Sequence, residues 1–134
     1  MQMDIIIQDH SPDNLERLYE NQFLYQTQDY SLMCEATDLP WLQFIPNRAL
    51  SDTEYAAKLY GEIYRVANFL KEKGLADHFN VAKIGNKLPY YHIHLVFRKP
   101  NDEAWPEPIW CLDDLTPSTD MPNKLKALLA DYFD

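Results

Sequence analysis

The sequence predicts an α+β fold with an antiparallel sheet, and three observations lead to this fold class. Residues 52–73 combine an N-terminal capping box with apolar side chains at three- and four-residue spacing, which is typical of a long amphipathic helix. Runs rich in aromatic and aliphatic residues lie on both sides of that stretch and are bounded by short turns. The strands do not alternate strictly with helices, so antiparallel pairing is favoured.

Length, composition and charge limit what the chain can be. Its 134 residues have the size of one domain and contain no repeat or linker-like segment, so we expect a single domain over residues 1–134. Hydrophobic residues make up 46% of the chain and charged residues 25%, as in folded proteins. The formal net charge of −9 disfavours extended nucleic acid and anionic membranes as partners, whereas a local pocket can still bind a small nucleotide.

The cysteines and the N-terminal residues indicate a compartment. Cys34 and Cys111 form no CxxC pair, and the N-terminus shows no signal-like segment. The apolar run at residues 5–7 is too short to cross a membrane. We therefore expect a cytoplasmic protein with two reduced thiols.

Three helices are expected, each with its own boundary signal. The first covers residues 12–20, with Ser11 as N-cap and a proline at the first helical position. The long helix over residues 52–73 opens with a capping box in which Ser51 is the cap, and it stops at a glycine. The third, over residues 122–133, has leucines on one side for burial.

Four runs have the composition of strands: residues 23–34, 41–45, 79–84 and 90–98. Residues 101–122 are rich in proline and acidic residues but contain two tryptophans, so we expect an ordered loop or sheet edge there. The tryptophans are expected to cover a sheet edge or to form the wall of a pocket.

Alternation along the strand at residues 90–98 separates an apolar face from a polar one. Tyr91, Ile93, Leu95 and Phe97 share one face, which we expect to pack against the long helix. On the other face lie His92, His94 and Arg98, with neighbours about 7 Å apart, a spacing suited to an anion or a metal ion. The alternative is a solvated sheet face, where histidines have no special role.

The sequence gives less support to other kinds of site. A His-x-His metal site needs further ligands, and His10 and His78 have no motif relation to the pair, so no metal is expected. Three glycines cannot build a phosphate-binding loop of the Walker or Rossmann type, and no GxSxG elbow occurs. Either cysteine could act as a nucleophile, but an inert buried thiol is the commoner state.

Four segments in order resemble a bacterial branch of the histidine triad (HIT) hydrolases: residues 40–48, 80–86, 92–94 and 104–110, the last reading AWPEPIW. They span about half of the chain. The resemblance implies an antiparallel sheet of about five strands with helices on it, usually in a homodimer, and no cofactor. It implies binding of a small nucleotide and cleavage at the α-phosphate through a covalent nucleotidyl-histidine.

The resemblance assigns roles to individual residues. His94 matches the nucleophile and His92 the first triad histidine, which supports it. Asn80 is similar to an asparagine near the phosphate, and the resemblance extends nucleotide or phosphate binding to Asn86. Trp41 is expected to line the pocket.

Val96 replaces the third triad histidine and cannot protonate a leaving group, so phosphoanhydrides such as dinucleoside polyphosphates are expected to be better substrates than phosphoramidates. Arg98, with its planar donors, is a candidate phosphate ligand or a salt-bridge partner. The resemblance leaves the ribose-binding acid open between Glu35 and Asp38.

Two alternatives to an enzyme remain: a HIT-fold nucleotide-binding protein without turnover, and a His-x-His metal-binding protein.

Overall fold

The computed structural model describes residues 4–85 and 88–133, and its α+β fold confirms the predicted fold class. In chain order the elements are α1 (Pro12–Tyr19), β1 (Gln22–Gln26), β2 (Tyr30–Cys34), β3 (Trp41–Pro46), α2 (Thr53–Glu72), β4 (His78–Ala82), β5 (Ile93–Arg98), the short 3-10 helix η1 (Ile109–Cys111) and α3 (Met121–Phe133). All three predicted helices are present. The cap of α2 differs: Asp52, not Ser51, accepts the N–H of Tyr55, at 3.2 Å.

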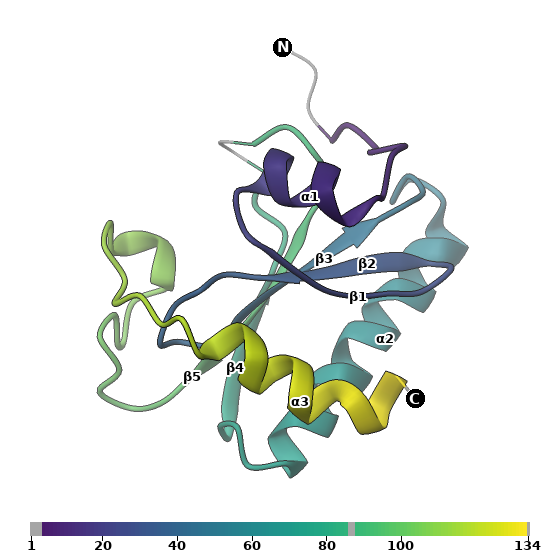
Figure 1. Cartoon of the computed structure of the whole chain (residues 1–134). Coiled ribbons are helices and arrows are strands. Elements are labelled where there is room, and N and C mark those ends of the chain that lie inside the picture. The colour runs from purple at the N-terminus through teal and green to yellow at the C-terminus, as the bar shows by residue number, and fades with distance from the viewer. Residues whose placement is uncertain (1–3, 86–87, 134) are drawn as a thin grey trace.

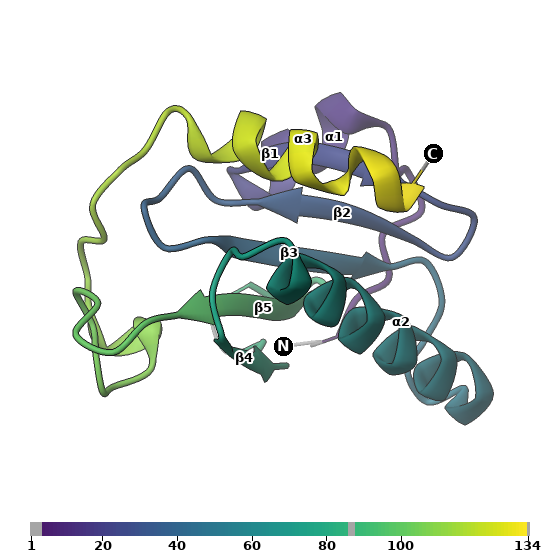
Figure 2. The same ribbon diagram turned by 90° about the horizontal axis from the view of Figure 1, so that it is seen from below.

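The strands form one antiparallel sheet in the order β1-β2-β3-β5-β4, so β5 lies between β3 and β4. Helices α2 and α3 cover one face, and α1 lies on the other (Figures 1 and 2). The loop between β5 and α3 projects beyond one end of the sheet (Figure 2).

The prediction of one strand over residues 23–34 is wrong. The chain reverses between β1 and β2, where the hydroxyl of Thr27 accepts the N–H groups of Asp29 and Tyr30. A threonine hydroxyl that bonds nearby backbone stabilises such a turn. The aromatic residues on both sides hid this short polar turn, and splitting the run gives the sheet its fifth strand.

The predicted strand over residues 90–98 is shorter than expected, because β5 begins at Ile93. Residues Tyr90 and Tyr91 pair instead with the N-terminal segment: the N–H of Tyr91 donates to the carbonyl of Ile5 at 3.0 Å. His92 therefore lies just before β5, between the strand and this bridge.

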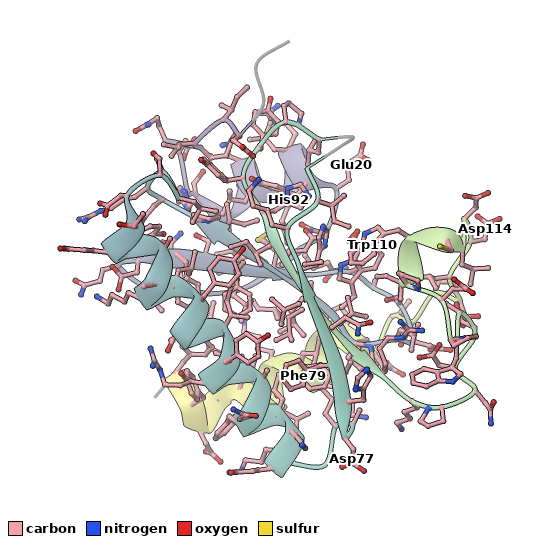
Figure 3. All side chains as sticks on the ribbon, turned by 180° about the vertical axis from the view of Figure 1, so that it is seen from behind. Glu20, Asp77, Phe79, His92, Trp110 and Asp114 are labelled. Carbon is pink, nitrogen blue, oxygen red and sulfur yellow. The ribbon has the colours of Figure 1, made fainter. Side chains whose placement is uncertain are left out.

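The apolar face of β5 packs as the alternation predicted. Ile93, Leu95 and Phe97 are fully buried in the main core with residues of α2 and α3. Phe79 of β4 joins this core from the neighbouring strand and points toward α2 (Figure 3). Tyr91 is buried but lies outside that cluster.

At the end of β5, Arg98 fastens the loop that follows. Its side chain is 2% exposed and holds both carboxylate oxygens of Asp102, at 2.7 and 3.0 Å. The same guanidinium donates to the side-chain oxygen of Asn80 at 3.0 Å and to the carbonyl of Glu107 at 2.8 Å. Burial alone would raise the pKa of Asp102, but Arg98 and the N–H groups of the loop hold it below its usual value.

We predict that Asp102→Asn lowers the free energy of unfolding by about 3–5 kcal/mol, because it leaves the buried Arg98 guanidinium without its counter-charge. Asp77→Asn, at an exposed position before β4, serves as the control and is expected to change stability by less than about 0.5 kcal/mol. Urea denaturation of both variants measures the difference. Equal stability of the two variants would show that the ion pair does not hold the loop.

Candidate active site

The polar face of β5 and the residue before it line up as predicted. His94, Val96 and Arg98 point away from α2, and His92 continues the row. His94 pairs with Gln43 of β3 and Ala82 of β4. The row is buried rather than solvated, which rules out the alternative of an ordinary exposed sheet face.

A cavity of about 530 Å³ opens beside the two histidines, and it has the size of a small-molecule pocket, about 300–1,000 Å³. Its walls come from Trp41 at the start of β3, from Ile84, Gly85 and Leu88, and from residues 109, 110 and 112–115 of the loop after β5. Figure 3 shows His92 near the start of β5, with Trp110 and Asp114 on the loop beside it.

His92 is held by a backbone carbonyl and by an aromatic edge. Its Nδ1 lies 2.7 Å from the carbonyl oxygen of Tyr90, and because a carbonyl only accepts, this nitrogen carries the proton in the neutral ring. Tyr19 of α1 lies edge-on to the ring, with centroids 5.8 Å apart. Burial lowers the pKa of His92, so the ring is neutral at pH 7 and its Nε2 has the lone pair.

His94 is held by an indole. The Nε1 of Trp41 donates to the Nδ1 of His94 at 2.9 Å. Burial, with a smaller contribution from His92, lowers the pKa of His94 to about 3, so this ring is also neutral. The two imidazole centroids lie 4.8 Å apart with nearly perpendicular planes. Both rings line the cavity, as an active site on this strand requires.

Charge in the cavity comes from two acids that the sequence did not single out. Asp113 and Asp114 are exposed at the rim, and no lysine or arginine lines the cavity within residues 4–85 and 88–133. Nothing local in the sequence marks these aspartates among the 21 acidic residues. They reach the cavity because the loop folds back from Arg98 past Trp110.

The structure places only some of the predicted binding residues at the cavity. Trp41 lines it, whereas Asn80 and Arg98 bond each other and are not among its described lining residues, so their binding of phosphate stays a prediction. Arg98 forms a salt bridge with Asp102, the alternative role that the sequence offered. Asn86 lies outside the described residues.

Neither candidate for the ribose-binding acid lines the cavity. Asp38 is exposed, with its N–H bonded to the carbonyl of Thr116. Glu35 is half-buried, and its burial, with a smaller contribution from Glu20, raises its pKa to about 7. Both acids lie in the connection between β2 and β3.

No cluster of three or more His, Cys, Asp or Glu side chains with the geometry of a metal site occurs among the described residues. None of the described helices combines the length and apolar composition needed to cross a membrane.

Three solved structures of known proteins are similar to this fold. A histidine triad protein from Bradyrhizobium japonicum is 30% identical, with a TM-score of 0.73 over 84% of this chain and 91% of that one. A histidine triad protein from Marinobacter aquaeolei is 26% identical, with a TM-score of 0.75 over 87% and 91%. A third, from Sinorhizobium meliloti, is 24% identical, with a TM-score of 0.74 over 87% and 93%, and shows the fold alone.

No family model and no curated protein matches the sequence. The fold of this chain, a five-stranded antiparallel sheet flanked by helices, is shared with these structures. The chain belongs to the histidine triad (HIT) family. This confirms the resemblance found in the sequence and supports a nucleotide-related function in general.

Acid should destabilise the protein through His94. A histidine whose pKa is lowered in the folded state binds fewer protons than in the unfolded state, so its contribution to stability is complete above pH 6.5 and is lost toward pH 3. Between pH 7 and pH 5 this loss is about 2 kcal/mol. Urea denaturation of the wild type and of His94→Asn at both pH values measures this loss. We expect the free energy of unfolding to depend less on pH in the variant than in the wild type.

The raised pKa of Glu35 acts in the opposite direction, because a carboxyl protonated in the folded state at pH 5 adds stability that is lost as the pH rises through 7. Glu35→Gln is therefore the matched variant, and it should make the loss of stability in acid larger. The same pH dependence in the wild type and His94→Asn would contradict the assignment of His94 as a buried neutral imidazole.

Proposed function

We propose that the protein is a nucleotide hydrolase or nucleotidyl transferase that acts at an α-phosphate, with His94 as nucleophile and His92 as its support. The observation that carries this proposal is the pair of neutral imidazoles, 4.8 Å apart, on the wall of a cavity of about 530 Å³. Burial keeps both rings unprotonated at neutral pH, and a nucleophile must have an unshared electron pair.

In the proposed reaction a lone pair of the His94 ring forms a bond to the α-phosphorus. The bond from that phosphorus to the leaving phosphate oxygen breaks, and the leaving oxygen keeps the electron pair. Water then attacks the same phosphorus, the P–N bond breaks, its electron pair returns to the ring, and the proton of the water passes to solvent. An acceptor other than water gives the transferase reaction.

The remaining walls suit the rest of a nucleotide. Asp113, Asp114 and Trp110 line the cavity. The carboxylates can accept hydrogen bonds from ribose hydroxyls, and the indole can cover a base. The family resemblance further implies a homodimer that needs no cofactor, and the two thiols expected to be reduced indicate the cytoplasm; all of these remain predictions.

The substrate class follows from Val96. This side chain is fully buried with Leu39, Ala104 and Ile109, so it supplies no proton to a leaving group. A general acid contributes about 10²–10⁴ in rate, and a phosphate leaving group needs it far less than an amine does.

We therefore predict that a dinucleoside polyphosphate is hydrolysed at least about 10²-fold faster than a nucleoside phosphoramidate, as measured by release of mononucleotide from each substrate. Equal rates for the two substrates would contradict this ranking.

The covalent intermediate provides the direct test. A labelled dinucleoside polyphosphate is mixed with the protein, the reaction is quenched in alkali, and the peptide that contains residues 92–94 is analysed by mass spectrometry. We expect the nucleotidyl group on His94 and a loss of at least about 10³-fold in turnover in His94→Ala. His78→Ala, at an exposed position on β4, is the matched control and should keep full activity. A label on another residue would refute the role of His94.

A second candidate, a nucleotide-binding protein without turnover, is favoured by one specific observation. The Nδ1 of His94 accepts a hydrogen bond from Trp41, so its lone pair is occupied. The single proton of the neutral ring is then on Nε2, and neither nitrogen has a free lone pair for attack. Nucleotide binding without release of mononucleotide, and with no labelled histidine, would select this candidate.

A further inference from the structure

The hydrogen bond between Trp41 and His94 fixes the position of a proton. An indole N–H can only donate, so the Nδ1 of His94, 2.9 Å away, must accept with its lone pair. A neutral imidazole has one proton, which in this arrangement is on Nε2. His94 therefore offers an N–H at Nε2 and has no free lone pair there.

His92 shows the opposite tautomer. Its Nδ1–H is bonded to the carbonyl of Tyr90, so its lone pair is at Nε2. With both rings on the cavity wall, the site presents one donor and one acceptor to a ligand.

Packing holds the indole in place. Trp41 lies opposite Val96 in the register between β3 and β5, one diagonal step from His94. The ring of Trp110 meets Trp41 edge-on with centroids 6.4 Å apart, and it also lies 5.0 Å from the ring of His94. Trp41 cannot leave Nδ1 without disturbing this cluster.

We propose that Trp41 is a positioning residue that holds His94 in the Nε2–H tautomer, so that His94 donates to a phosphate oxygen and does not attack phosphorus until the indole bond is broken. This inference rests on the proposed function only for the identity of the ligand. Because one nitrogen cannot both donate a proton to the phosphate and attack it with a lone pair, Trp41 sets the balance between holding a nucleotide and cleaving it.

The tautomer can be measured without any substrate. In the full chain labelled with ¹⁵N-histidine, two-bond ¹⁵N–¹H correlation spectra at neutral pH distinguish a protonated ring nitrogen from an unprotonated one. We expect His94 to be protonated at Nε2 and His92 at Nδ1. In Trp41→Phe the indole donor is gone, and the Nδ1–H population of His94 should rise about tenfold, the bias that one hydrogen bond of ordinary strength gives.

Two further variants separate the hydrogen bond from packing. Trp110→Phe removes the other indole that contacts His94 but keeps an aromatic ring against Trp41. The bond from Trp41 to Nδ1 is kept in this variant, so the tautomer of His94 should be unchanged. Site-specific replacement of Trp41 by benzothienylalanine keeps the two-ring shape and removes only the N–H, so it gives the answer if Trp41→Phe fails to fold. An unchanged His94 tautomer in the benzothienylalanine variant would overturn the proposal.

Kinetics then connect the tautomer to the chemistry. With a labelled dinucleoside polyphosphate, single-turnover formation of nucleotidyl-His94 should be about tenfold faster in the benzothienylalanine variant than in the wild type. A slower single-turnover rate, despite the altered tautomer, would refute the restraining role of Trp41. If the tautomer changes but no protein forms the covalent intermediate, the control of the tautomer by Trp41 stands and the proposed hydrolase function fails.

Discussion

Burial of β5 on both faces is the constraint on which the rest of the structure depends. The strand lies between β3 and β4, and each of its six residues is buried. Ile93, Leu95 and Phe97 fix its register, because a shift by one residue would move His94 and Arg98 into the apolar core under α2. The geometry of the site is therefore a consequence of hydrophobic packing on the opposite face of the sheet.

The polar side chains on the far face of β5 are out of water and need partners inside the protein. Arg98 has partners in the loop that follows, and these bonds fasten the loop to the end of β5. His94 finds one in Trp41 on the neighbouring strand. Val96 lies between them and packs beneath the loop with Ile109. Val96 thus anchors the loop that carries Trp110, Asp113 and Asp114 to the cavity.

Local patterns in the sequence predicted the elements better than the contacts between them. The spacing in α2 and the alternation in β5 were sufficient to predict the type and the buried face of each element, because each pattern is set by the geometry of its own backbone. The turn at Thr27 was missed, since only the short polar stretch of residues 26–29 interrupts a run of aromatic and aliphatic residues. The partners of Arg98 and the aspartates at the cavity could not be predicted, because many acids offer the same charge and only the folded loop selects among them.

Because both imidazole rings are neutral, the position of the proton on His94, and not the charge of the rings, separates nucleotide binding from catalysis in the proposed function. A pocket lined by lysine or arginine would hold phosphate by charge, but the described lining has only acidic side chains among its charged groups. In the proposed complex, the Nε2–H of His94 would donate a hydrogen bond to a phosphate oxygen. Burial lowers the pKa values of both imidazoles, so protonation does not distinguish a binding state from a reactive one at neutral pH. The remaining variable is which nitrogen of His94 has the proton, and the partner that sets it lies on β3, outside the histidine motif itself.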